Sequence, residues 1–214
     1  AAMLAPMAEA FSASALITRL GSASLTLWPK LLTQLPAQVF FQQQGSLVVS
    51  HPQDRGDYLN FVNHLQRNLQ GTKLAKQLIV CDAQQLKQLE PDLPESFQLG
   101  VHLRAEGQLD NRALYQVSAQ ALSASRVECR FNTPIERIDN NHLFYAGQQQ
   151  SFDWVIDCRG LGAHGSQAGA LPQLRGVRGE VIRLHAPEVK LTRPIRLMHP
   201  RYPLYIVPKP NNEF

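Results

Sequence analysis

The 214 residues are enough for one large domain or two smaller ones with a proper core, and 44% hydrophobic with 18% charged residues is ordinary for a soluble globular protein. The net charge of +4 comes from Lys and Arg that are scattered along the chain. Because nucleic-acid binding favours a basic stripe or interleaved aromatic residues, we do not expect a nucleic-acid partner.

The cysteines and the apolar segments indicate the cellular compartment of the protein. The three cysteines are an odd number, lie far apart and form no CxxC pair, which argues against a disulfide framework or a structural zinc site and for a reducing compartment. No run reaches the roughly 18 apolar residues of a membrane span. The first stretch, AAMLAPMAEAF, lacks the basic region of a signal peptide. We therefore expect a cytoplasmic protein with no membrane partner.

The first half of the chain mixes helices and strands. A helix is predicted over residues 14–35, and Pro29 is expected to kink or end it. Residues 39–51 predict two strands around Gly45, and residues 54–69 predict a helix. A strand over 77–82, a helix over 83–91 and an alternating, half-buried strand over 97–104 follow. The apolar faces of the two longer helices comprise Leu16, Leu20, Ala23, Leu27 and Leu31, and Tyr58, Phe61, Val62 and Leu65, respectively.

The second half is richer in strands. Asp110 is expected to cap a helix with Leu114, Val117 and Ala121 on its apolar face. Further strands are predicted at 126–131, 133–139, 142–147, 154–158, 177–184, 194–198 and 204–207. Residues 209–212 predict a tight turn, after which Glu213 and Phe214 would begin a partner strand that is left unpaired. The pattern indicates a mixed α/β (α+β) protein with two layered units.

The stretch WVIDCRGLGAHG is the most informative for chemistry. A strand that runs directly into Gly160 and Gly162 lets a ligand approach the main chain closely. The alternative is a turn in which the glycines are needed only because the backbone has a positive φ. The spacing is not that of GxGxxG, and no acidic residue follows at the required distance. The histidines show no metal-binding spacing, no GxSxG motif is present, and Cys158 is best explained as a small buried filler. We therefore predict no metal site.

Tyr205 has two interpretations. In LYIVP it points to the opposite sheet face from Leu204 and Ile206. It could pack in the core with a satisfied hydroxyl, or it could line an apolar pocket and hold one polar group of a ligand. The local sequence does not separate these alternatives.

Seven segments in order resemble motifs of the FAD-dependent D-amino-acid oxidase family, most closely its glycine oxidase branch, which is linked to thiamine biosynthesis. Each motif is weak by itself, but their order is fairly specific and covers nearly the whole chain. They are AAMLAP (1–6), LKQLEP (86–91), EGQLDNRAL (106–114), NTPIERID (132–139), WVIDCRGLGA (154–163), LRGVRGEVIRL (174–184) and LYIVPKP (204–210).

The resemblance implies a domain organisation. It predicts an incomplete Rossmann-like FAD-binding domain formed by residues 1–35 and 106–172. An incomplete substrate domain with a large mixed or antiparallel sheet would comprise 36–105 and 173–214. The family's first βαβ unit with GxGxxG would precede Ala1, and the arginine that binds the substrate carboxylate would follow Phe214. By this interpretation the sequence is the interior of a longer protein.

The resemblance also implies site residues. Ala2, Met3 and Leu4 would line the flavin ring, and Ala2 stands where the family prefers glycine. Ile135 would meet the adenine through its main chain, and Gly160 and Gly162 would lie against the flavin. Tyr205 would be the catalytic tyrosine on the substrate side.

The implied reaction is the oxidation of glycine or another small amine or amino acid. A hydride would pass to the flavin of FAD, and dioxygen would then reoxidise the flavin and yield hydrogen peroxide. A homo-oligomer is possible by the same resemblance. Two alternatives remain: an oxidoreductase of this fold for an N-methyl amino acid or a modified tRNA base, and a truncated, inactive scaffold.

Overall fold

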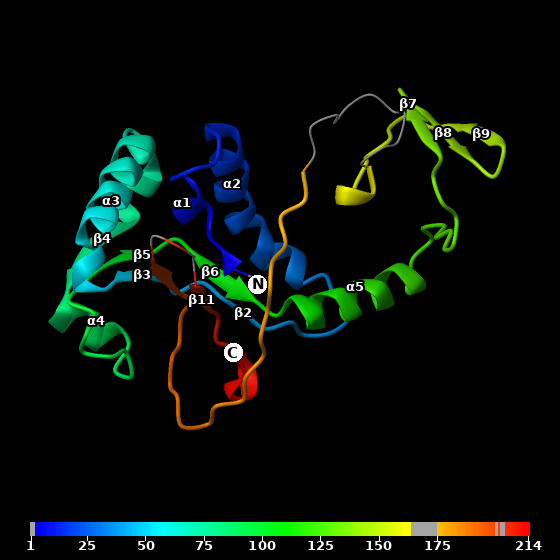
Figure 1. Cartoon of the computed structure of the whole chain (residues 1–214). Helices are drawn as coiled ribbons and strands as arrows, with labels where there is room; N and C mark the ends of the chain where they lie inside the picture. Colours follow the sequence, from blue (N-terminus) through cyan, green and yellow to red (C-terminus); the bar gives the residue numbers. More distant parts are fainter. Residues whose placement is uncertain (1–2, 164–174, 200, 202–203) are drawn as a thin grey trace. The chain divides into compact units, whose positions relative to one another are not determined.

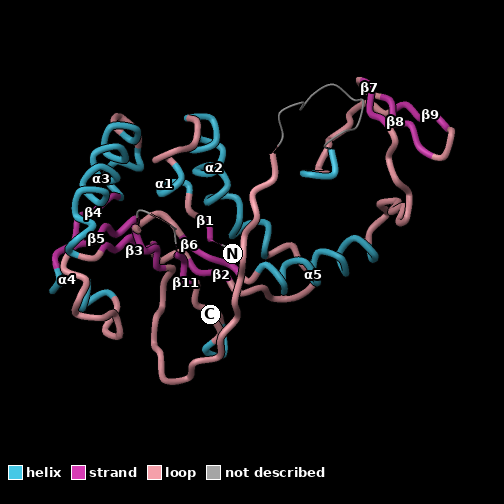
Figure 2. Tube along the Cα trace, in the orientation of Figure 1, coloured by secondary structure: helices cyan, strands magenta, loops and turns pink. Residues whose placement is uncertain are grey.

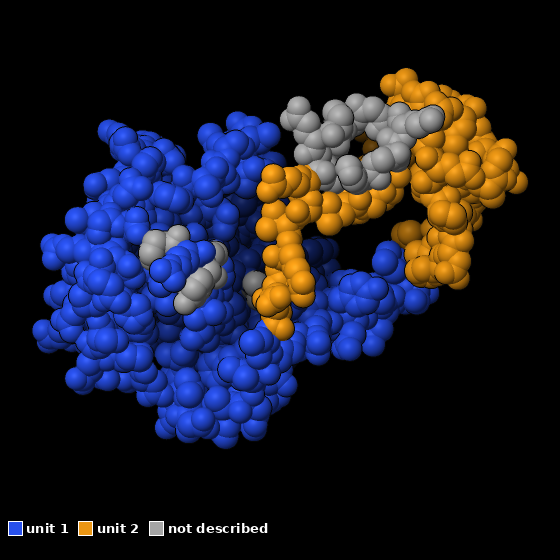
Figure 3. Space-filling model, viewed as in Figure 1, with its two compact units in different colours: residues 1–125, 182–214 blue, residues 126–181 orange. Residues whose placement is uncertain are grey.

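The computed structural model describes residues 3–163, 175–199, 201 and 204–214. These residues form two compact units, one of residues 1–125 with 182–214 and one of residues 126–181 (Figure 3). The units are described separately below. The predicted division into an FAD-binding and a substrate domain follows different boundaries and stays a prediction.

The first unit contains a mixed five-stranded sheet. Its order is β11-β10-β3-β5-β4, in which β10 and β3 are parallel and the other neighbours antiparallel. A second, antiparallel sheet has the order β1-β6-β2. The strands are β1 (Met3–Leu4), β2 (Phe41–Gln42), β3 (Ser46–Ser50), β4 (Leu78–Asp82), β5 (Leu99–Leu103), β6 (Gly107–Leu109), β10 (Ile195–Met198) and β11 (Leu204–Ile206).

Five α-helices accompany these sheets. They are α1 (Pro6–Glu9), α2 (Ala15–Leu32), α3 (Arg55–Leu69), α4 (Ala83–Leu89) and α5 (Asn111–Ala124). As Figures 1 and 2 show, α3 and α4 lie on opposite sides of the five-stranded sheet. Alternation along β3 explains this arrangement, since Val48 faces the cluster formed with α1 and α3, whereas Leu47 and Val49 face the cluster formed with α4.

Most elements predicted in the first half are confirmed. Helix α3 buries the four predicted residues Tyr58, Phe61, Val62 and Leu65. The side chain of Asp110 caps α5 by accepting hydrogen bonds from the amides of Arg112 and Ala113, at 2.9 and 3.1 Å. The two strands predicted around Gly45 exist, but β2 and β3 belong to different sheets.

Helix α2 has its predicted length but not a covered apolar face. It continues through Pro29 to Leu32, and only Leu25 is buried. The four leucines of the predicted face are about half exposed because no other described element covers them; they are Leu16, Leu20, Leu27 and Leu31. Periodicity therefore predicts the helix correctly, whereas what the helix packs against is a tertiary property.

Three predicted strands are wrong. Residues 126–131, 154–158 and 177–184 form no strand, and the side chains of Trp154 and Ile156 are 86% and 83% exposed. A strand needs a neighbour for its N–H and C=O groups, and no described strand pairs with these segments, although Leu184 at the end of 177–184 bonds to Phe214. The second unit contains the antiparallel sheet β7-β8-β9 instead, with β7 (Arg137–Asp139), β8 (His142–Tyr145) and β9 (Gln148–Ser151).

At the C-terminus, the predicted turn over 209–212 is confirmed, whereas the predicted lack of a partner for residues 213–214 is wrong. The amide of Lys209 donates to the carbonyl of Glu213 at 2.7 Å across the turn. Phe214 is not left unpaired, because it exchanges two main-chain hydrogen bonds with Leu184, at 3.0 and 3.1 Å. Glu213 is therefore hydrogen-bonded to Lys209, and Phe214 is hydrogen-bonded to Leu184.

Candidate functional site

Tyr205 lies on β11, at the edge of the five-stranded sheet, and its side chain is 37% exposed. Its register partner on β10 is Arg196, so the two side chains project from the same face. That face also carries Val48, which pairs with Arg196 on the other side, and it faces α3. Tyr205 is thus partly exposed to solvent rather than buried in the core.

The guanidinium of Arg196 lies close to two aromatic rings. Its central carbon is 5.3 Å from the ring centroid of Tyr205 and 5.5 Å from that of Phe61 on α3, both within the range of a cation–π interaction. The Nε atom is buried and has no hydrogen-bond partner among the described residues. Arg196 therefore lies beside both Tyr205 and Phe61, and its Nε donor remains unused.

The charge of this arginine acts on a buried carboxyl group, that of Glu106. Glu106 is fully buried immediately before β6, and it accepts hydrogen bonds from the amide of Ala8, at 2.7 Å, and from the hydroxyl of Ser46. Burial raises the pKa of Glu106 to about 7, against the opposing effects of these hydrogen bonds and of the charge of Arg196. Glu106 thus holds the start of α1 against β3.

The segment predicted to line the flavin ring belongs to the same unit. In β1, Met3 pairs with Gln108 and Leu4 with Gly107, so this short strand is added to the strand that follows Glu106. Both residues are half-buried. The prediction for Ala2 lies outside the described residues. Glu106 holds this segment by accepting the hydrogen bond from Ala8, and the charge of Arg196 acts on the same carboxyl group.

The other predicted cofactor residues lie in the second unit. Gly160 begins a single turn, Gly160–Ala163, with a φ of +56°, and a methyl group added there would meet no atom within 4 Å. Ile135 is half-buried in the segment before β7. Next to the turn, hydrogen bonds from Arg159 lower the pKa of Asp157 to about 2. The backbone at Gly160 is therefore in the left-handed conformation that glycine adopts without strain.

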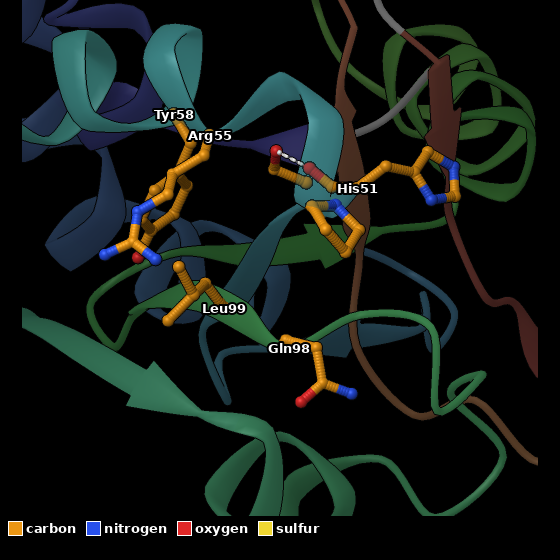
Figure 4. A pocket seen from close by; sticks show the side chains of 7 residues that line it. His51, Arg55, Tyr58, Gln98 and Leu99 are labelled. Atoms are coloured by element: carbon orange, nitrogen blue, oxygen red, sulfur yellow. Dashed lines mark hydrogen bonds between the residues drawn. The ribbon is translucent and has the colours of Figure 1, made fainter.

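A pocket of about 300 Å³ lies elsewhere, at the carboxyl end of β3 (Figure 4). It contains none of the predicted site residues. Its hydroxyl groups are used internally, since Tyr58 donates to the carbonyl of Gly100 at 2.9 Å and Ser50 to that of His51 at 3.0 Å. Burial raises the pKa of Tyr58 to about 12. The pocket therefore offers little reactive chemistry.

Glu106 and Arg196 are functional candidates that the sequence analysis missed. The available signal was a charge inside an apolar strand, as in the stretch PIRLM around Arg196. Only the fold reveals that Ser46 contacts Glu106 and that the charge of Arg196 acts on the Glu106 carboxyl. In the described part of the chain, no group of three or more potential ligands could hold a metal ion, and no helix is long and apolar enough to cross a membrane.

Comparison with known proteins defines the class. The family model described as FAD dependent oxidoreductase (DAO) matches residues 1–214. The chain therefore belongs to the DAO family of FAD-dependent oxidoreductases, as the motifs predicted, and FAD is the cofactor of this family.

Comparison with individual relatives gives more detail than the family model. A protein of Rhizobium etli named as a thiamine biosynthesis oxidoreductase, ThiO, is 33% identical over 212 residues, which are 99% of this chain and 56% of that protein. Two glycine oxidase structures cover the whole chain: that of Geobacillus kaustophilus has a TM-score of 0.73 at 20% identity, and that of Bacillus cereus 0.72 at 17%. These matches confirm the mixed α/β fold class. The chain spans 58% and 59% of those two structures, little more than half of each relative.

Proposed function

We propose that this chain forms part of a flavin-dependent oxidase that deaminates glycine or another small amine or amino acid and reduces dioxygen to hydrogen peroxide. The observation that carries the proposal is that Tyr205, which lies beside Arg196, belongs to the same compact unit of a DAO-family chain as Met3 and Leu4. The Rhizobium relative, named for thiamine biosynthesis, supports a role in supplying that pathway.

The residues proposed to hold FAD are Met3, Leu4, Ile135, Gly160 and Gly162, with Ala2 at the start of the chain. The bound flavin would accept the two electrons of the oxidation. The chain would orient the amine and exclude water, with the Tyr205 hydroxyl making a hydrogen bond to the substrate. No side chain needs to act as acid or base, which agrees with the lack of a catalytic dyad or triad motif.

The first test is the visible absorption spectrum of the purified full-length protein, with its intact mass measured on the same sample. We expect a flavin spectrum, followed by oxygen consumption with glycine. A colourless protein that neither takes up added FAD nor oxidises glycine, sarcosine or D-proline would contradict the proposal. Preference for sarcosine over glycine would favour an N-methyl amino acid instead.

Replacing Tyr205 by phenylalanine is expected to lower kcat/KM for glycine roughly 5- to 10-fold, because one hydrogen bond to the substrate is lost. Steady-state oxygen consumption measures the effect. Tyr115→Phe is the matched control, since Tyr115 is 79% exposed on α5 and should leave the rate unchanged. Equal rates for wild type and Tyr205→Phe would remove Tyr205 from the substrate site.

Replacing Gly160 by alanine, compared with the same change at Gly147, should distinguish the effect of backbone strain from the effect of a lost cofactor contact. The left-handed φ costs an alanine about 1 to 2 kcal/mol, and the added methyl group would stand where the flavin is proposed to approach. We expect flavin affinity to fall roughly tenfold or more, as measured by titration of the apoprotein. Gly147→Ala has the same cost, with a φ of +71° and open space, and should not change flavin affinity.

A further inference from the structure

Helix α1 is capped by a side chain from a distant part of the sequence. The residue before its first turn is Ala5, whose side chain offers no acceptor for the free amides at the helix start. In most helices a Ser, Thr, Asp or Asn at that position accepts one of these hydrogen bonds. Here the carboxyl group of Glu106, 98 residues further along, accepts hydrogen bonds from the main chain of Met7 and of Ala8, the latter at 2.7 Å.

The carboxyl group that caps α1 is itself fixed at both oxygens. One oxygen accepts the hydrogen bond from Ala8 and the other accepts one from the hydroxyl of Ser46 on β3. Glu106, Met7 and Ala8 are all buried, so the two amides would lose their acceptor inside the core if the carboxyl group were removed. Glu106 therefore determines where α1 begins.

Strand β1 ends one residue before the N-cap of α1, so the position of α1 also constrains Met3 and Leu4. The strand pairs with β6, and no described strand lies on its other side. Main-chain groups at such a free edge are available to a ligand, and both side chains are only half-buried. Apolar side chains beside a few polar groups are typical of a cofactor site, so this strand fits the flavin of the family.

We infer that Glu106 is a positioning residue for the flavin: by capping α1 it holds Met3 and Leu4 where the cofactor binds. This inference deepens the proposed function and rests on it for the contact between these two residues and the flavin. Because the carboxyl group is fully buried and both of its oxygens accept hydrogen bonds, Glu106 acts through α1 rather than by touching the cofactor.

The test uses the purified full-length protein after removal of bound flavin. Hydrogen exchange reports the opening of the Met7 and Ala8 amides, and titration with FAD gives its Kd. We expect Glu106→Ala to speed the exchange of both amides roughly tenfold or more and to raise the Kd for FAD roughly tenfold. Glu106→Gln should restore both values to within about threefold of the wild type, because its amide oxygen can accept from Ala8 and its NH2 group can donate to Ser46.

Asp82→Ala is the matched control, because it removes the cap of another helix in the same unit. Asp82 caps α4 by accepting a hydrogen bond from the amide of Gln85 at 2.9 Å, and α4 packs in a different cluster from α1. The exchange of the Gln85 amide should become faster, with the Kd for FAD unchanged. An equal rise of this Kd in Asp82→Ala and Glu106→Ala would reflect a general loss of stability and would overturn the inference.

The remaining outcomes separate the inference from the proposed function. In a wild-type protein that oxidises glycine, unchanged amide exchange or an unchanged Kd for FAD in folded Glu106→Ala overturns the inference alone. If Glu106→Ala does not fold, the same results in Glu106→Asp, whose shorter side chain cannot reach both Ala8 and Ser46, overturn it. A Kd for FAD that depends on Glu106, in a protein that oxidises no small amine or amino acid, contradicts the proposed function alone. A wild-type protein that binds no FAD contradicts both.

Discussion

Replacing Glu90 by alanine is expected to lower the free energy of unfolding by about 3 to 5 kcal/mol, the range for breaking a buried ion pair from one side. Glu90 is fully buried and accepts hydrogen bonds from the amide and hydroxyl of Thr192 and from the amide and guanidinium of Arg193, at 2.7 to 3.0 Å. Alanine would leave the charge of Arg193, itself largely buried, without a counter-ion.

Urea unfolding at constant pH measures this effect. Glu95→Ala, at an exposed glutamate close by in sequence, should change the free energy of unfolding by less than about 0.5 kcal/mol. Glu90→Gln should lie between the two, since one amide oxygen can still accept. A loss below about 1 kcal/mol for Glu90→Ala would show that the network contributes little.

Glu106 is expected to make the stability of this protein fall as pH rises. Its pKa is about 7 in the folded chain, above the ordinary 4.5. Between these values the folded state binds more protons than the unfolded state, so this contribution is complete below about pH 4.5 and is lost as pH rises through 7. A shift of this size corresponds to about 3 kcal/mol.

Denaturant unfolding at pH 5 and pH 8 of the wild type and of Glu106→Gln isolates this effect. Glutamine cannot titrate, so the wild type should lose about 2.5 kcal/mol more than the variant between the two pH values. His102, whose pKa is lowered by burial, titrates in both proteins and cancels in the comparison. The same loss in both proteins would mean that Glu106 is ionised throughout and paired with Arg196.

The Glu90 network also explains a sequence motif. LKQLEP was used above only for its resemblance to the family, and the structure gives its glutamate a structural role, in holding a segment about a hundred residues further along. In EGQLDNRAL, likewise, Asp110 caps α5 while Glu106 anchors α1. Motif residues could be found from the sequence, but their partners could not.

Sequence by itself determined the elements whose causes are local. The periodic apolar residues of α3, the alternation of β5 and the cap at Asp110 each act within a few residues of one another. The ordered motifs likewise placed the chain in its family, because they need no knowledge of contacts. Tyr205 could be nominated on the same basis.

Only the tertiary structure decided which groups meet. Residues 154–158 have the composition of a strand but no described neighbour to pair with, and the apolar face of α2 has no described element to cover it. Arg196 lies against the rings of Phe61 and Tyr205. Glu106 accepts hydrogen bonds from Ser46 and Ala8, which are 60 and 98 residues away in the sequence. Strand pairing, side-chain burial and the pKa of a carboxyl group depend on such long-range contacts. A local sequence pattern does not contain this information.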